Sequence, residues 1–135
     1  MTQRILEILA QGLTRILIPG LTMTIPMTIL AFTLSMAVAL AIALAQFAKL
    51  PVLTQFSRFY IWVFRGTPLL VQLFIIYYGL GQLGLKLPAF VAGVIALGLN
   101  EGAYCAETVR AALESVPVGQ LEAGECVGLT WWQTI

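Results

Sequence analysis

The chain contains no histidine, and its two cysteines, Cys105 and Cys126, stand far apart. Without a Cys-x-x-Cys pair or a histidine the sequence offers no recognisable zinc site or disulfide framework. We expect both cysteines to be small apolar residues, with a regulatory thiol as the alternative. The apolar runs also lack a Ser-Lys or Asp-Asp arrangement that could serve an intramembrane enzyme. We therefore expect no metal, no cofactor and no catalytic centre in this chain.

Charge is also scarce. Only 10% of the 135 residues are charged, seven basic and six acidic, whereas 60% are hydrophobic. A net charge of +1 cannot hold a nucleic-acid backbone, so nucleic-acid binding is excluded as a function. No Gly-x4-Gly-Lys-Ser/Thr loop is present to cradle a nucleotide phosphate. This composition lies outside the range of soluble domains and predicts an all-α, polytopic membrane protein.

The first apolar run contains no charge between Arg15 and Lys49, which is longer than one membrane crossing of roughly 20 residues. We place the crossing at residues 21–45 and expect a break at Pro19-Gly20. Before that break, residues 1–18 read as an amphipathic helix in the membrane interface. Its apolar stripe and its polar stripe consist of Ile5, Leu9, Leu13 and Leu17, and of Glu7, Gln11 and Arg15.

Within this first crossing, small residues recur at four-residue spacing, at Ala31, Ser35, Ala39 and Ala43. In lipid, helices associate by close approach, which small side chains permit. The ridge predicts a face that packs against another helix, although an alanine-rich helix without such packing would carry the same pattern.

A second crossing is expected at residues 59–85, interrupted at 66–68. Thr67 and Pro68 read as the N-cap and first residue of a new helix, with Gly66 as the joint. Arg65 has two readings, as an interfacial anchor whose charge reaches water or as an ion-pair partner of the third helix. Gln72 either bonds to another helix or to backbone, or contacts transported cargo.

The third crossing is expected at residues 88–112 and becomes polar from Asn100 onward. Glu107, Arg110 and Glu114 have spacings at which one helix face can neutralise its own charge. Glu101 lies about 20 Å along the helix from its start. A carboxylate at that depth marks a functional site by default; the alternatives are a paired structural charge and a helix shallow enough to leave Glu101 in water.

The connection between the first two crossings carries Lys49, Arg58 and Arg65 and no acid, whereas the second connection carries only Lys86. The positive-inside bias then places the first connection in the cytoplasm and the N-terminus outside. The closing segment, residues 115–135, is expected in the cytoplasm as well.

That closing segment reads as a short helix between two turns. Pro117 breaks the third helix, and a new one is expected from Gly119 to Val127. Gly128 can end it with a positive φ, and Thr130 can cap a further helix that begins at Trp131.

Three stretches resemble a known family, the membrane-spanning permease subunits of ATP-binding-cassette importers in their polar amino-acid branch (histidine, glutamine, arginine and cystine type). They are "FRGTPLLVQLFIIYYGL", "AYCAETVRAALESVPVGQLEA" and the Glu-Ala-x4-Gly spacing of Glu122 to Gly128. "SRFYIWVFRGTPL" is most similar to cystine-type permeases. The chain departs from the pattern at Gly124, which replaces an alanine, and at Glu101, where a small or neutral residue is expected.

The resemblance implies a type I importer permease of about five spans, of which this chain supplies the N-terminal three. It implies transport of polar amino acids across a bacterial cell membrane, and three kinds of partner: ATPase subunits that bind the ATP, an external substrate-binding protein, and a second permease copy or paralogue. A membrane assembly or regulatory subunit that docks an ATPase without transport is the alternative. The implied coupling-loop residues are Gly119, Gln120, Glu122, Ala123, Gly124 and Gly128.

Two further groups complete the candidate residues. A translocation pathway would involve Gln72, Asn100 and Glu101. A structural motif shared with the family would comprise Arg65, Gly66, Thr67, Pro68, Tyr104, Glu107 and Arg110.

Overall fold

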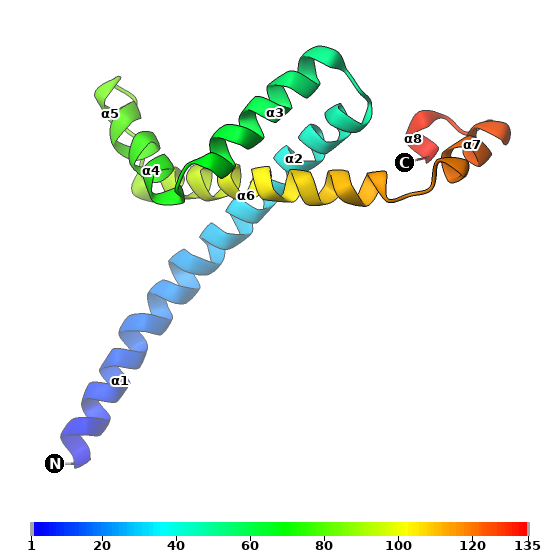
Figure 1. Cartoon of the computed structure of the whole chain (residues 1–135). Helices are drawn as coiled ribbons and strands as arrows, with labels where there is room; N and C mark the ends of the chain where they lie inside the picture. Colours follow the sequence, from blue (N-terminus) through cyan, green and yellow to red (C-terminus); the bar gives the residue numbers. More distant parts are fainter. Residues whose placement is uncertain (1, 135) are drawn as a thin grey trace.

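The computed structural model describes the backbone of residues 2–134, with side chains at residue 4 and from residue 11 onward. Every regular element in residues 2–134 is a helix, so the expected all-α fold is confirmed (Figure 1). The elements are α1 Thr2–Pro19, the π-helical turn η1 Gly20–Thr24, α2 Ile25–Phe47, α3 Pro51–Gly66, α4 Leu69–Phe74, the π-helical turn η2 Ile75–Gly79, α5 Leu80–Gln82, α6 Ala89–Glu114, α7 Val118–Cys126 and α8 Trp131–Thr134.

The expected break at Pro19-Gly20 is absent, because α1, η1 and α2 form one continuous rod (Figure 1). Proline removes one backbone donor, and the wider π-helical turn that follows accommodates this loss without ending the helix. The Thr22 hydroxyl donates to the Ile18 carbonyl at 2.8 Å, which satisfies one carbonyl at this point. The N-terminal segment is therefore the extension of the first crossing helix; its expected place in the interface stays a prediction.

Among the described residues, two helices are long and apolar enough to cross a membrane, Gln11–Phe47 and Ala89–Glu114. The helix α3 and the run from α4 to α5 are bent by 104° relative to one another. If the two count as one broken span, the described chain has a third crossing. The sharp bend lies within the interruption expected at 66–68. The preceding helix is longer than expected, however, because α3 already begins at Pro51.

The bend is formed by two extended residues, and the expected capping is wrong by one position. Thr67 (φ −121°, ψ 141°) ends α3, while Pro68 (ψ 138°) is the N-cap and Leu69 the first residue of α4. A residue before proline disfavours the helical region, which keeps Thr67 extended. Its hydroxyl donates back to the Val63 carbonyl at 2.8 Å, so it closes α3 instead of capping α4.

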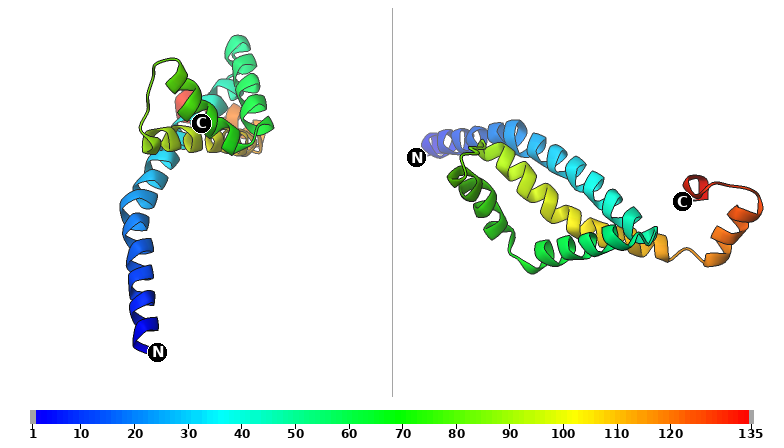
Figure 2. Two further views of the ribbon diagram at one scale, coloured as in Figure 1. Left: turned by 90° about the vertical axis from the view of Figure 1, so that its left-hand side faces the viewer. Right: turned by 90° about the horizontal axis from the view of Figure 1, so that it is seen from above.

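The core is the contact between α2 and α6, which run side by side with α3 across their ends (Figure 2). The predicted ridge is confirmed: Ala31, Ser35, Ala39 and Ala43 are all buried. The buried residues of α6 are equally small: Ala92, Gly93, Ala96, Gly98, Gly102, Ala103 and Ala106. Small residues on both sides let the two backbones approach closely, and such packing is one of the main sources of attraction between helices in lipid.

Candidate functional site

A network of polar side chains connects the two halves of the broken span, α3 and α4, to each other and to α6. The Gln72 side chain is buried, and the two N–H groups on its Nε2 atom are shared among three acceptors, the carbonyls of Phe64 (2.9 Å) and Thr67 (3.0 Å) and Thr67 Oγ1 (2.8 Å). Asn100 on α6 donates from Nδ2 to Gln72 Oε1 at 3.1 Å and to the Phe64 carbonyl at 3.3 Å. The two amides thus satisfy carbonyls that the end of α3 leaves open, as buried backbone requires.

These bonds give Gln72 the first of its two expected roles, contact with backbone and another helix. Because its amide is fully engaged, it has little capacity left for cargo. Asn100 is engaged in the same network, so two of the three candidate pathway residues lie together and act on the bend.

Glu101, the third candidate, points elsewhere. It lies on an exposed part of α6 and lines a pocket of ~310 Å³ together with Asn100 and apolar residues of α2, α4 and α6. Its Oε1 accepts a weak bond from Cys105 Sγ at 3.6 Å, and no cation pairs with it among the described side chains. An unpaired carboxylate beside a largely apolar cavity can attract a ligand cation.

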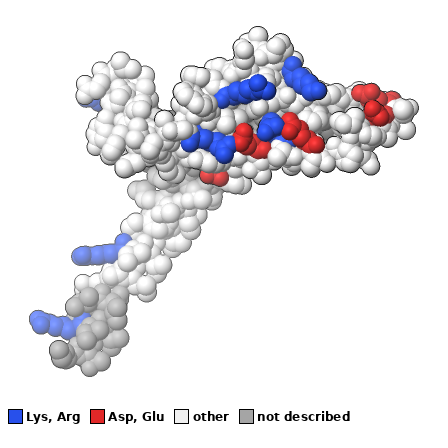
Figure 3. Space-filling view, in the orientation of Figure 1, with Lys and Arg blue, Asp and Glu red and all other residues white. Residues whose placement is uncertain are grey.

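Charges gather over α3 and the C-terminal half of α6 (Figure 3). Arg65 pairs with Glu107, and its guanidinium carbon lies 5.2 Å from the centre of the Tyr104 ring. Of the two interpretations of Arg65, the structure shows the ion pair with the third crossing helix. Arg110 bonds to Glu114 at 2.7 Å, so the expected contact between Glu107 and Arg110 is not made, because Arg65 takes its place.

Both partners of the interhelical pair are partly exposed, Arg65 to 40% and Glu107 to 39% of the side chain. Solvent at this exposure screens the charges, so the pair contributes about 0–1 kcal/mol to stability. The pair links the end of α3 to the C-terminal half of α6.

A further contact was missed by the sequence interpretation. The Tyr60 hydroxyl on α3 donates to the Leu99 carbonyl on α6, and a β-carbon at Gly102 would lie 3.2 Å from that hydroxyl. Nothing in the sequence paired this tyrosine with a particular carbonyl.

The α7–α8 unit follows α6 after the turn at Ser115–Pro117 and projects from the end of the bundle (Figure 2). Gly128 has the positive φ expected of it, +80°. Its N–H bonds to the Glu125 carbonyl at 3.0 Å, and the Leu129 N–H bonds to the Gly124 carbonyl at 3.0 Å. This pair of bonds is a Schellman motif, which ends α7 and fixes the direction of the chain that follows.

The candidate coupling residues divide into exposed and packed positions. Gly119, Gln120, Glu122 and Ala123 are exposed on α7, whereas Gly124 is buried. A β-carbon at Gly124 would lie 2.9 Å from Thr134 Cγ2, so the glycine in place of the usual alanine lets α8 pack closely on α7. Gln133 Oε1 accepts bonds from the Thr130 N–H and hydroxyl, which is half of a capping box at the start of α8.

The comparisons with known proteins agree with this architecture. Residues 37–135 match the family described as "Binding-protein-dependent transport system inner membrane component". The chain is 44% identical over 129 residues to the L-cystine transport system permease protein TcyB of Bacillus subtilis (strain 168), covering 96% of this chain and 55% of that protein. It is 40% identical over 114 residues to the putative glutamine transport system permease protein GlnP of Rickettsia prowazekii (strain Madrid E), covering 84% and 52%.

The fold has a counterpart among solved structures. An amino acid ABC transporter crystallised with histidines superimposes with a TM-score of 0.78 at 43% identity, over 93% of this chain and 58% of that one. The chain spans about half the length of the curated relatives it matches. Together these matches establish that the chain is a membrane protein and belongs to the family of binding-protein-dependent transport system inner membrane components.

Proposed function

We propose that this chain forms part of the membrane pathway of an ATP-binding-cassette importer for polar amino acids, with cystine among the first substrates to test. The relatives named for cystine and glutamine transport support the substrate class. The chain does not act as an enzyme in this proposal, since ATP is bound and hydrolysed by separate ATPase subunits. An external binding protein and a second permease copy or paralogue complete the assembly.

The projecting α7–α8 unit is the observation that carries the proposal. It is a short helix with a fixed turn, placed at the end of the longest packed helix of the bundle (Figure 1). A partner that moves this unit as a rigid body would transmit its displacement through Ser115–Pro117 to α6, and from α6 to α2. Energy then reaches the pathway by contact.

Glu122 is the residue expected to meet the ATPase. It is exposed on α7, and no cation pairs with it among the described residues. An unpaired carboxylate on a rigid helix can bond to a basic or polar group in a partner's groove with little loss of conformational freedom.

The test is uptake of radiolabelled cystine, arginine, glutamine and histidine by cells that also carry the ATPase and the binding protein. We expect uptake of at least one of these, and its loss in Glu122→Lys through charge reversal at the docking contact. Glu125→Lys makes the same change one turn further along α7 and serves as the matched control. Equal uptake by both variants would refute the role of Glu122.

The alternative, an assembly subunit that docks an ATPase without transport, makes a different prediction. It would require ATPase binding with no uptake of any amino acid. The small-residue ridge of α2, which could have served dimerisation of such a subunit, is instead buried against α6 within the chain. The structure thus leaves that ridge no free surface for a partner copy.

The Glu101 carboxylate is proposed to contact the ammonium group of the transported amino acid. Charge-assisted hydrogen bonds contribute about 1.5–3 kcal/mol, so Glu101→Gln is expected to lower uptake of a cationic amino acid about tenfold or more. Glu114→Gln removes the same charge from the exposed end of α6 and is the control. Unchanged uptake in Glu101→Gln would show that the pocket at Glu101 lies outside the pathway.

A further inference from the structure

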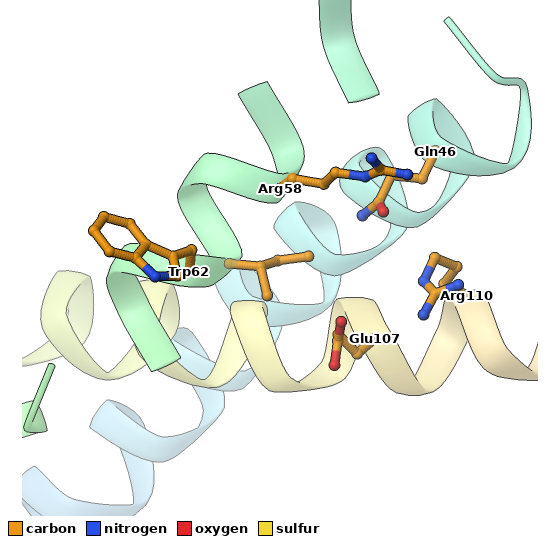
Figure 4. A pocket seen from close by; sticks show the side chains of 6 residues that line it. Gln46, Arg58, Trp62, Glu107 and Arg110 are labelled. Carbon is orange, nitrogen blue, oxygen red and sulfur yellow. The ribbon is translucent and has the colours of Figure 1, made fainter. Parts of the chain in front are cut away.

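A second cavity lies between α2, α3 and α6, away from the pocket at Glu101. It has a volume of ~270 Å³, and its lining residues are Gln46, Arg58, Ile61, Trp62, Glu107 and Arg110. Figure 4 shows that the polar side chains converge on it from all three helices: Gln46 from α2, Arg58 from α3, and Glu107 and Arg110 from α6. No role proposed above uses Gln46 or Trp62, and Arg58 has served only the argument on membrane orientation.

The side chain of Gln46 indicates that this cavity lacks a hydrogen-bond acceptor. Its Nε2 atom is buried and is the one buried side-chain nitrogen or oxygen without a hydrogen-bond partner in the part of the chain that the structure describes. Leaving a buried donor unpaired costs about 1–3 kcal/mol. Because the atom is covered in the ligand-free chain, an acceptor oxygen of a ligand would remove this cost only after a neighbouring side chain moves aside.

The net charge around the cavity is positive and favours an anionic ligand. Glu107 is neutralised by Arg65 and Arg110 by Glu114, whereas Arg58 has no ion-pair partner among the described residues. Once each of these two ion pairs is counted as neutral, the positive charge of Arg58 remains. A single negative charge with several acceptor oxygens, as in a phosphodiester, therefore complements both the charge and the unpaired amide.

The position of the cavity indicates that the anion is a lipid head group. The cavity opens beside the ring pair of Phe59 and Trp62, whose centroids lie 6.2 Å apart and which are 60% and 72% exposed. Exposed tryptophan in a membrane protein settles at the level of the lipid head groups. The α6 residues of the cavity, Glu107 and Arg110, belong to the polar half of that helix, where we expect the edge of the hydrocarbon layer.

We propose that this cavity binds the phosphate of an anionic phospholipid. Arg58 supplies the charge and a planar fork for two phosphate oxygens, and Gln46 Nε2 donates to the phosphate group. The Phe59 and Trp62 rings lie along the glycerol and the first methylenes of the chains. Basic pockets between membrane helices hold anionic head groups by the same combination of charge and depth.

The experiment is a titration of the purified chain in detergent with phosphatidylglycerol or phosphatidylcholine, followed by native mass spectrometry. We expect one phosphatidylglycerol to bind in preference to phosphatidylcholine, whose choline cancels the phosphate charge. Arg58→Gln is expected to weaken phosphatidylglycerol binding about fivefold. Arg15→Gln makes the same change on the projecting helix α1 and should leave binding unchanged.

Gln46→Leu separates a ligand site from a mere packing defect. If Gln46 serves the lipid, this variant binds phosphatidylglycerol more weakly, while the lipid-free chain melts at the same or a higher temperature because an unpaired amide has been removed. If it melts higher and binds phosphatidylglycerol as the original chain does, the proposal fails.

Two further measurements distinguish loss of the lipid site from misfolding of the variant and from binding of free phosphate. Should Arg58→Gln lose helical circular dichroism, Arg58→Lys keeps the charge without the fork and must bind more weakly than the original chain for the proposal to stand. Inorganic phosphate is added in competition: displacement of phosphatidylglycerol at equal concentration would assign the cavity to free phosphate and overturn the lipid assignment. Equal binding by Arg58→Gln and Arg15→Gln would overturn it as well.

Discussion

At the scale of single residues, Gly98 is the tightest point between α2 and α6. A β-carbon there would lie 2.7 Å from Leu34 Cδ2 and 3.1 Å from Leu34 Cβ, so moving the tip of the leucine alone does not relieve the clash. We expect Gly98→Ala to destabilise the chain by about 1–3 kcal/mol, the usual cost of overpacking. The measurement is thermal unfolding in detergent, followed by tryptophan fluorescence.

The matched control for this prediction is Gly12→Ala. Gly12 lies within α1, and a β-carbon added there would meet nothing within 4 Å, so alanine is expected to be neutral or slightly stabilising through its helix propensity. If Gly98→Ala and Gly12→Ala melt alike, close approach of the two helices at Gly98 is not what holds them.

The residues of the core differ in how far the sequence could predict them. The ridge from Ala31 to Ala43 was predictable because a repeat of four residues defines one helix face. Its counterpart on α6 was not, since a repeat does not reveal which helix faces it. The Gln72 bonds were predictable as a kind of contact, but their acceptor at Phe64 depends on the 104° bend, which the sequence located without giving its angle.

At the scale of elements, Gly128 sets the angle between α7 and α8. At φ +80° a β-carbon meets the following carbonyl, which costs about 1 kcal/mol, or about fivefold in an opening equilibrium. Gly128→Ala should therefore speed hydrogen exchange at the Leu129 amide, whose bond to Gly124 closes the turn. Gly119→Ala lies on the same helix with a free β-carbon position and should leave that exchange unchanged.

The ends of elements were less predictable than their existence. Two prolines did not mark the helix ends as expected. After Pro19 the helix continues through a π-helical turn, and at Pro68 the new helix begins one residue later than expected, at Leu69. In both places a threonine hydroxyl bonds to a carbonyl four residues earlier. Whether such a bond sustains a helix or closes it is decided by packing against the rest of the bundle, which the local sequence does not contain.

At the scale of the whole molecule, the separation of charge predicts how the chain lies in the membrane. Lys49 lies in the turn between α2 and α3, and the side chains of Arg58 and Arg65 reach the C-terminal half of α6. The turn that carries Lys86 joins α5 to α6 at the other end of α6. From the positive-inside bias we expect the C-terminal end of α6, and with it α7 and α8, to face the cytoplasm. This orientation also puts the proposed docking unit on the side where ATP is available.

The orientation can be tested with Cys126, which is exposed on α7 and serves as a natural label site. In a Cys105→Ala background, a membrane-impermeant maleimide is expected to label Cys126 in inverted vesicles and to leave it unlabelled in intact spheroplasts. Lys86→Cys, combined with Cys126→Ser, should give the opposite pattern, because α6 separates the two positions by a full crossing. Labelling of Cys126 from outside would reverse the topology and place α7–α8 beyond the reach of an ATPase, so the same result would also refute the proposed coupling.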